Sequence, residues 1–144
     1  MILYIENNFN MQELNFHPID NSSDTAKICV PLLIEMYKPK SVLDLGCGIG
    51  WWLKSFINNG ITDVLGIDGH NMIPELKIPT DNFFACDLSQ DLKFSRKFDL
   101  AICIEVAEHL DEKSADQLVQ TIINSSDTVF WSSATIGQGG FNHI

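Results

Sequence analysis

The sequence predicts an α/β fold, a doubly wound parallel sheet of about five strands in the order 3-2-1-4-5. Short apolar runs typical of buried strands alternate with helix-like segments, which is the pattern of a parallel sheet. The first strand leads into a turn with three glycines that a helix follows. Right-handed crossovers then place the first and fourth strands side by side. The expected strands span residues 41–45, 63–67, 83–85, 98–104 and 128–132.

Three helices are expected, over residues 22–37, 51–59 and 112–124. In the first, Ser22 or Ser23 suits the N-cap position, and Pro31 should kink the helix or split it in two. Gly60 is expected to cap the C-terminus of the second. In the third, apolar residues recur at spacings of three and four and are expected to face the core: Ala115, Leu118, Val119, Ile122 and Ile123.

The glycine turn is the most informative segment, and it reads Asp44-Leu-Gly46-Cys-Gly48-Ile-Gly50. Glycines let backbone approach a ligand closely, and the N-terminus of the next helix points to the same place, as in nucleotide sites. A dinucleotide-binding fingerprint has its third glycine three positions after the second. Trp51 holds that position, so an NAD-binding oxidoreductase is the less favoured alternative.

The turn resembles the D-x-G-x-G-x-G motif of class I S-adenosylmethionine (SAM)-dependent methyltransferases. Glu105-Val-Ala-Glu108-His109 is similar to the E-V-x-E-H motif of the small-molecule branch of that family. Residues 41–44, 48–53, 65–69 and 138–143 also look like one bacterial-type subfamily, and the resemblance covers nearly the whole chain from about Ser22. It implies a Rossmann-like fold and methyl transfer from SAM to a small-molecule or glycan-like acceptor, with S-adenosylhomocysteine (SAH) as product.

The same resemblance implies which residues hold the cofactor. The glycine turn would wrap the methionine end and ribose of SAM, Asp68 would accept the ribose hydroxyls, and Asp87 would take the adenine amino group. Two alternatives stay open, because Asp68 also suits the start of an Asp-Gly turn and Asp87 suits an ordinary loop. The cofactor-binding residues predicted in this way are Asp44, Gly46, Cys47, Gly48, Gly50, Asp68, Gly69, Asp87, Leu88 and Glu105.

The catalytic candidates are His109 and Glu105. The methyl group of a sulfonium is already activated, so positioning supplies much of the rate and a base is needed only for an acceptor that must lose a proton. His109 is a candidate base, or alternatively a residue that caps or packs at the next helix. Glu105 alternatively orients the methionine amino group or contacts substrate, and Glu108 is expected to be a solvated helix-start acid.

We expect packing roles for the tryptophans beside the turn and no catalytic or metal-binding role for the remaining histidines. One of Trp51 and Trp52 is expected to pack on the sheet, and the other to shape the acceptor side. His17, His70 and His143 have no metal-ligand spacing, so no metal is expected.

The charge and residue composition of the chain indicate which kinds of partner and location are expected. The net charge of −10 disfavours a nucleic-acid partner. The densest positive group, Lys93, Arg96 and Lys97, reads as a solvated loop. No apolar run approaches membrane-spanning length, and the start of the chain does not read as a signal peptide. Single cysteines in or beside apolar runs indicate buried free thiols and a cytoplasmic enzyme: Cys29, Cys47, Cys86 and Cys103.

The expected organisation is an N-terminal arm over residues 1–20 and a SAM-binding methyltransferase domain over residues 21–144. The family's sheet has seven strands, whereas five are predicted here, so we expect a truncated domain that lacks the C-terminal hairpin. The strand at 128–132 would then be an open edge, covered by a homodimer or followed by a loosely ordered C-terminus. The alternative function is a SAM-binding module without independent catalysis.

Overall fold

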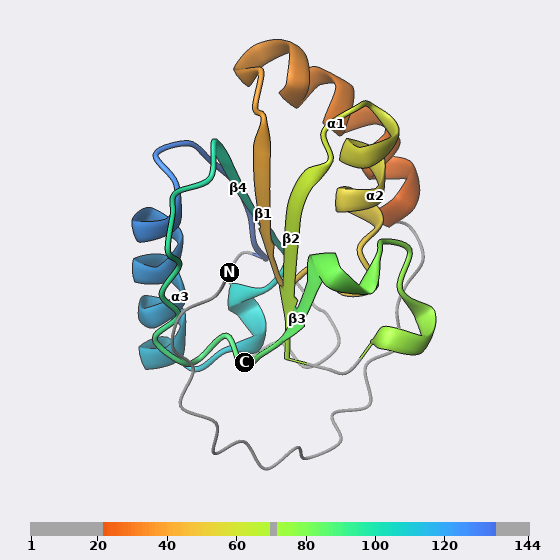
Figure 1. Cartoon of the computed structure of the whole chain (residues 1–144). Helices are drawn as coiled ribbons and strands as arrows, with labels where there is room; N and C mark the ends of the chain where they lie inside the picture. The colour runs from red at the N-terminus through yellow and green to blue at the C-terminus, as the bar shows by residue number, and fades with distance from the viewer. Residues whose placement is uncertain (1–21, 70–71, 135–144) are drawn as a thin grey trace.

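A computed structural model describes residues 22–69 and 72–134 and shows three layers (Figure 1). The central layer is a parallel sheet. Helices α1 (Ser22–Tyr37) and α2 (Trp51–Asn58) cover one face, and α3 (Glu112–Ser125) covers the other. The predicted arm over residues 1–20 and the glycine-rich tail after residue 134 lie outside the described residues.

The described residues form a five-stranded sheet in the order β3-β2-β1-β4-β5, with all neighbours parallel. This confirms the predicted fold class and strand order. The strands are β1 (Ser41–Leu45), β2 (Asp63–Asp68), β3 (Phe83–Ala85), β4 (Leu100–Ile104) and β5 (Val129–Ser132). Three short 3₁₀ helices join them, η1 (Ile73–Glu75), η2 (Thr80–Asn82) and η3 (Ala107–His109).

The core lies in two parts, one on each face of the sheet. Successive strand residues point to opposite faces, so Val42 and Leu100 pack under α1 and α2, while Leu43 and Ala101 pack under α3. Every residue of β1 is buried. This is the burial expected of the central strand in a doubly wound sheet, and it places the end of β1 at the middle of the carboxyl edge.

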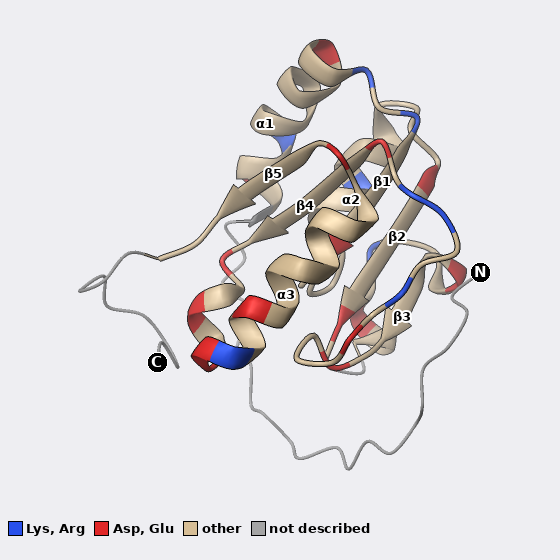
Figure 2. Cartoon of the chain, turned by 90° about the vertical axis from the view of Figure 1, so that its left-hand side faces the viewer, with Lys and Arg blue, Asp and Glu red and all other residues tan. Residues whose placement is uncertain are grey.

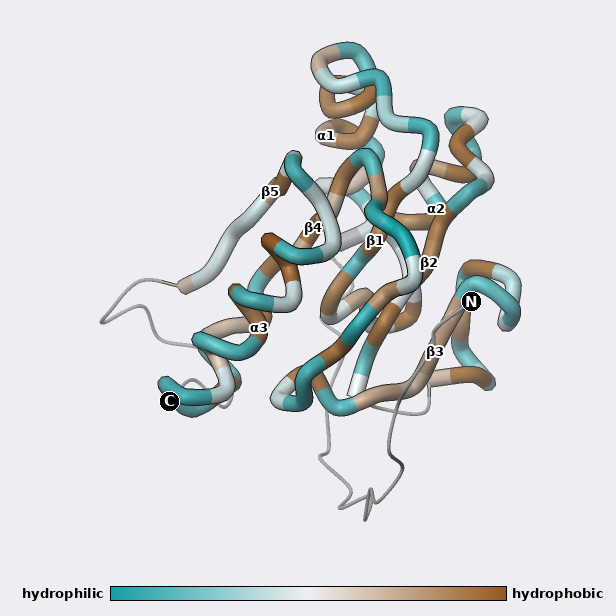
Figure 3. Tube along the Cα trace, turned by 60° about the vertical axis from the view of Figure 1, so that its left-hand side comes forward, coloured by the Kyte–Doolittle hydropathy of each residue, from teal (hydrophilic) through white to brown (hydrophobic). Residues whose placement is uncertain are grey.

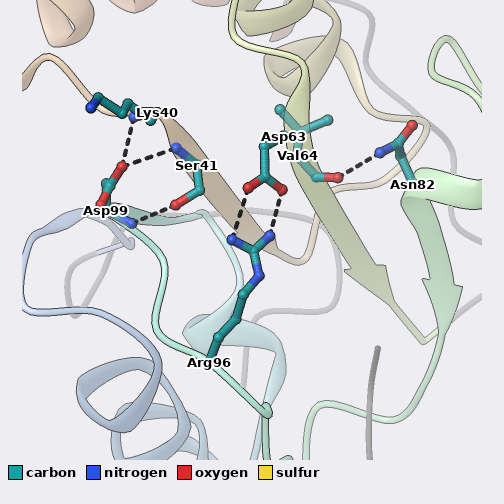
Figure 4. Close-up of polar contacts among 7 residues, drawn as sticks. All are labelled: Lys40, Ser41, Asp63, Val64, Asn82, Arg96 and Asp99. Atoms are coloured by element: carbon teal, nitrogen blue, oxygen red, sulfur yellow. Dashed lines mark hydrogen bonds and ion pairs between the residues drawn. The ribbon is translucent and has the colours of Figure 1, made fainter.

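Polar side chains fix the amino edge of the sheet (Figure 4). One Asp99 carboxylate oxygen accepts hydrogen bonds from the backbone N–H groups of Lys40 (2.7 Å) and Ser41 (3.2 Å), and the Asp99 N–H donates to the Ser41 hydroxyl (2.9 Å). Arg96 makes a bidentate ion pair with Asp63 at the start of β2. The starts of β1, β2 and β4 are therefore anchored from the loop that precedes β4.

Two predicted boundaries differ from the structure. The fourth strand begins at Leu100 rather than at Phe98, because Asp99 uses its N–H on the Ser41 hydroxyl instead of a strand neighbour, and Phe98 forms only an isolated bridge with Ser126. The first helix is not split at Pro31 but runs unbroken from Ser22 to Tyr37. Tertiary packing of its buried face offsets the hydrogen bond that proline removes.

The apolar row of α3 is only partly buried, which corrects the prediction that all of it faces the core. Leu118 and Ile122 are buried, whereas Val119 and Ile123 are 42% and 51% exposed. In the described residues the sheet ends at β5, and Val129 and Trp131 on that strand are also exposed. The outer half of the row therefore lies over the uncovered margin of the sheet. No helix within the described residues is long and apolar enough to cross a membrane.

Candidate functional site

The turn after β1 is a left-handed backbone segment held against β2. The N–H groups of Gly46 and Cys47 both donate to the Ile67 carbonyl oxygen, at 2.8 and 3.1 Å. Gly46, Gly48 and Gly50 have φ values of 85°, 53° and 89°. Residues with a side chain rarely adopt such positive φ values, so the turn favours glycine at all three positions.

The three glycines face different surroundings. A Cβ on Gly46 would lie 2.2 Å from Cγ2 of Val106, and one on Gly50 would lie 3.0 Å from Cγ1 of Ile78. A Cβ on Gly48 would meet no atom of the described part of the chain within 4 Å, its chain neighbours apart. Gly46 and Gly50 therefore permit close packing inside the protein, and Gly48 is the glycine of the turn that faces open space.

Asp68 lies beside this open glycine. It is the last residue of β2, and its Oδ2 accepts a hydrogen bond from the Gly48 N–H at 2.9 Å. The structure thus brings together two predicted cofactor residues that are 20 positions apart. The next residue, Gly69, approaches the Cys86 carbonyl oxygen, which is 3.7 Å from its Cβ position.

Asp44 is a buried carboxylate behind the turn. It is 3% exposed, and its Oδ2 has no hydrogen-bond partner. Burial, and then the charge of Asp68, raise the pKa of Asp44 well above its usual value. Burial first, and then the Asp44 charge, also raise the pKa of the Cys47 and Cys103 thiols. These thiols are free and stay protonated at neutral pH.

Asp87 and Leu88 follow β3, but their side chains are already engaged. The Asp87 carboxylate accepts hydrogen bonds from the Ser89 N–H (2.9 Å) and the Gln90 side-chain amide (3.3 Å), which closes a turn. Leu88 is buried in the core under α3. A ligand would therefore compete for the Asp87 oxygens and would reach Leu88 through its backbone.

Glu105 stands directly after β4 in an unusual backbone conformation. Its φ of 55° is one of two positive values among the described non-glycine residues. Its N–H donates to the Ser132 carbonyl oxygen at 2.8 Å, and its Oε1 accepts a hydrogen bond from the Ser132 hydroxyl. Ser132, which the sequence did not single out, therefore holds Glu105 at the end of β5.

Glu108 and His109 belong to η3, the 3₁₀ helix that follows. Glu108 is not the solvated acid predicted from the sequence. Its Oε1 accepts a hydrogen bond from the Ala134 N–H at 3.2 Å, and its Oε2 is buried without a partner. The backbone just after β5 thus binds the Glu108 carboxylate, which would be exposed if it stood only at the start of a helix. His109 is half-buried, and its backbone N–H donates to the Val106 carbonyl oxygen at 3.0 Å.

The two tryptophans at the start of α2 take different positions. Trp52 is buried and packs against Phe130 of β5, with ring centroids 5.9 Å apart, which confirms that one of the pair packs on the sheet. Trp51 is half-buried, and the Lys77 ammonium lies 5.4 Å from its ring centroid. Its indole Nε1 is buried without a partner, and its role on the acceptor side stays a prediction.

The assembled site is acidic. Asp44, Asp68, Glu105 and Glu108 all come from the carboxyl ends of β1, β2 and β4, and Figure 2 shows red segments at the end of β2 and after β4. Among the described residues no group of three or more His, Cys, Asp or Glu is placed to hold a metal ion. The arrangement suits a ligand with positive charge and with hydroxyl groups that donate to carboxylates.

Comparison with known proteins identifies relatives of this architecture. A family model described as a methyltransferase domain matches residues 25–126. The methyltransferase domain of bacterial CtHen1-C is 24% identical, with a TM-score of 0.63, over 76% of this chain and 64% of that chain. DesVI from Streptomyces venezuelae is 17% identical, with a TM-score of 0.70, over 85% of this chain and 55% of that chain.

A third structure was solved with a ligand. The plantazolicin methyltransferase BpumL, in complex with a monoazolic desmethylPZN analogue and SAH, is 19% identical, with a TM-score of 0.59, over 74% of this chain and 44% of that chain. At these identities the solved structures show a shared fold, and this chain spans less than two thirds of each of the three. No curated protein matches the chain significantly.

Proposed function

Because the chain belongs to the methyltransferase-domain family, we propose that it binds SAM and its product SAH at the carboxyl edge of the sheet. We further propose that it transfers the methyl group to a small-molecule or glycan-like acceptor. Bound SAH in BpumL supports the choice of cofactor. A small acceptor is in keeping with the desmethylPZN analogue in that complex and with the net charge of −10, which opposes nucleic-acid binding.

The observation that carries this proposal is the open position of Gly48 at the Asp68 carboxylate, whose charge in turn acts on the buried Asp44. The backbone of Gly48 faces space that a Cβ would enter, Asp68 lies at its N–H, and the Asp44 Oδ2 is buried without a partner. SAM combines ribose hydroxyls with a cationic sulfonium and ammonium group, which these carboxylates complement. The residues present therefore fit the cofactor.

Each residue has a defined task in this proposal. Gly48 lets the backbone approach the ligand, Asp68 accepts the ribose hydroxyls, and Asp44 supplies negative charge toward the cationic end. Bound SAM supplies an activated methyl group, which a correctly placed acceptor displaces in line from sulfur. Catalysis then depends chiefly on how this chain orients the acceptor. Glu105, which Ser132 holds at the end of β5, is proposed to orient the amino group or the acceptor.

Asp68→Ala is expected to weaken SAH binding by about 1–3 kcal/mol, because it removes charge-assisted hydrogen bonds to the ribose. Isothermal titration calorimetry with SAH measures the change. Asp63→Ala is the matched control, since it removes a carboxylate from the opposite end of the same strand. Equal affinities for the two variants would remove Asp68 from the site. Tight NADH binding without SAH binding would overturn the proposed function.

The alternative function is SAM binding without independent catalysis. This chain spans 64% of CtHen1-C and less of the other two proteins, so more than a third of each of those chains lies outside the match. Labelled SAM tested against sugars, lipids and small acids separates the two functions. Binding with product formation supports the enzyme, and binding without product supports the module. We expect tight cofactor binding and weak turnover from residues 1–144 alone.

His109→Ala is expected to lower the free energy of unfolding by about 1–2 kcal/mol, because it truncates a half-buried side chain that packs at η3. Methyl transfer per folded molecule should be unchanged. Thermal unfolding and initial rates measured on the same preparation test both expectations. A rate loss of about 10²–10⁴ with unchanged SAH affinity would instead identify the imidazole as the general base.

We also propose that the sheet edge at β5 is covered by a second copy of the chain. Exposed Val129 and Trp131 on this edge strand support the proposal. A cytoplasmic location is supported by the four free cysteines. The absence of a nucleic-acid partner is supported by the loop lysines and arginine, which are paired with carboxylates: Lys93 with Asp91, Arg96 with Asp63 and Lys97 with Asp127.

A further inference from the structure

The side of helix α1 that faces away from the protein carries a row of exposed apolar residues beside the exposed Glu35. Ala26, Val30 and Leu33 are buried against the core. On the opposite side, Ile28, Leu32 and Met36 are 69%, 54% and 68% exposed. Their spacing of four residues places them in one row along the helix. A helix that is apolar on both sides is normally buried on both, and Figure 3 shows brown segments along α1.

The two ends of this row carry opposite charge. Asp24 lies in the first turn of α1, is exposed, and forms an ion pair with Lys27 of the same helix. Lys38 and Lys40 follow the last turn, and within the described residues their ammonium groups make no ion pair. A shallow cleft of about 490 Å³ opens beside these lysines, between the end of α1 and the start of β4.

We propose that two copies of this chain associate through α1, with the helices antiparallel and a two-fold axis at Leu32. In this arrangement Leu32 lies against the partner's Leu32, and Ile28 lies against the partner's Met36. Asp24, at one end of the row, then lies toward the partner's Lys38 and Lys40, which follow the other end of the helix. The surface is thus self-complementary in both shape and charge, as an isologous interface requires.

The charge of the chain favours a second copy, rather than another partner, on the exposed side of α1. An anionic membrane surface would be repelled by a chain of net charge −10. A parallel pairing of the two helices would set Asp24 against the partner's Asp24 and the lysines against each other. Antiparallel pairing relieves both repulsions and covers three large side chains on each copy.

Sedimentation equilibrium of the full chain tests the association. A dimer is expected from the α1 surface alone, and a larger assembly if the edge at β5 pairs as well. Leu32→Glu places two carboxylates on the axis and should weaken the dimer by about 100-fold. Ile73→Glu, at an exposed apolar residue of η1, is the matched control and should leave it unchanged. Thermal unfolding confirms that each variant is folded. A chain that stays monomeric up to about 300 μM would overturn the proposal.

A variant of β5 distinguishes this surface from the sheet edge. If Trp131→Glu dissociates the dimer into monomers while Leu32→Glu does not, the dimer forms at β5 and the proposal for α1 is wrong. If only Leu32→Glu dissociates it, α1 is the interface. The result does not depend on SAH binding, because neither residue belongs to the candidate cofactor site.

Disulfide trapping tests the antiparallel register directly. In a Cys29→Ser background, Leu32→Cys should crosslink under mild oxidation, because the axis brings two copies of residue 32 together. Ile28→Cys alone should not crosslink, whereas a mixture of Ile28→Cys and Met36→Cys should. The buried thiols of Cys47, Cys86 and Cys103 do not compete. Crosslinking of Ile28→Cys to itself would show a parallel pairing and overturn the proposed register.

Discussion

Gly48→Ala is expected to weaken SAH binding by about 1–3 kcal/mol, or about 5- to 150-fold in Kd, with a folded protein. Apart from its chain neighbours, no atom of residues 22–69 and 72–134 lies within 4 Å of the added methyl group, so a bound ligand is what it would displace. The cost to the fold is limited to the left-handed backbone at φ 53°, about 1–2 kcal/mol for alanine.

Gly46→Ala is the matched comparison within the same turn. Its Cβ would lie 2.2 Å from Val106, so the fold itself must give way, at a cost of about 2–5 kcal/mol of unfolding free energy. Calorimetry with SAH and thermal unfolding on both variants separate the two roles. Full SAH affinity in folded Gly48→Ala would show that the ligand does not approach this backbone.

Asp44→Asn is expected to stabilise the protein at neutral pH by about 1–3 kcal/mol while weakening SAH binding. The folded-state pKa of Asp44 is raised, chiefly by burial, so the folded protein holds this proton to higher pH than the unfolded chain does. The contribution of Asp44 to stability is therefore largest below the unfolded pKa of about 3.9 and falls as pH rises toward the folded-state pKa. Asparagine cannot ionise and removes this decline.

Denaturant unfolding of wild type and Asp44→Asn across a pH series measures the difference. The two stabilities should converge at acidic pH and separate as pH rises, and an Asp81→Asn control at an exposed carboxylate should follow wild type. Parallel pH profiles for wild type and Asp44→Asn would contradict the burial of an ionisable, unpaired Asp44. Stabilisation together with weaker binding would show a site that trades stability for ligand affinity.

The sequence predicted the fold because its local signals agree with one another. The apolar run before the glycines, the helix after them, and the alternation that follows all indicate one doubly wound sheet. Strand order followed from crossover handedness. The positions of Asp68 and Glu105 at the ends of the two strands that flank β1 could likewise be read along the chain, because parallel strands end at the same edge of a sheet.

Other features of the site depend on contacts between distant segments. Gly46 packs on Val106, 60 positions along the chain, and Gly50 packs on Ile78, contacts that the local sequence does not indicate. The partner of the Glu108 carboxylate is likewise distant, since it is the N–H of Ala134, beyond β5. Val119 and Ile123 have apolar spacing, but spacing indicates which side chains share a face and not whether another layer covers it.

The hydrogen bonds of Asp99 at the amino edge fix the position of β4 relative to β1. β1 and β4 each contain five residues and run in parallel register, with Val42 beside Leu100. Counted from the anchored pair of Ser41 and Asp99, Gly46 lies level with Ile104 at the carboxyl edge, and Glu105 comes one residue later. An insertion of one residue in either strand would shift that end by about 3.3 Å and turn its side chains to the opposite face. The lengths of β1 and β4 thus determine how far the glycine turn lies from Glu105.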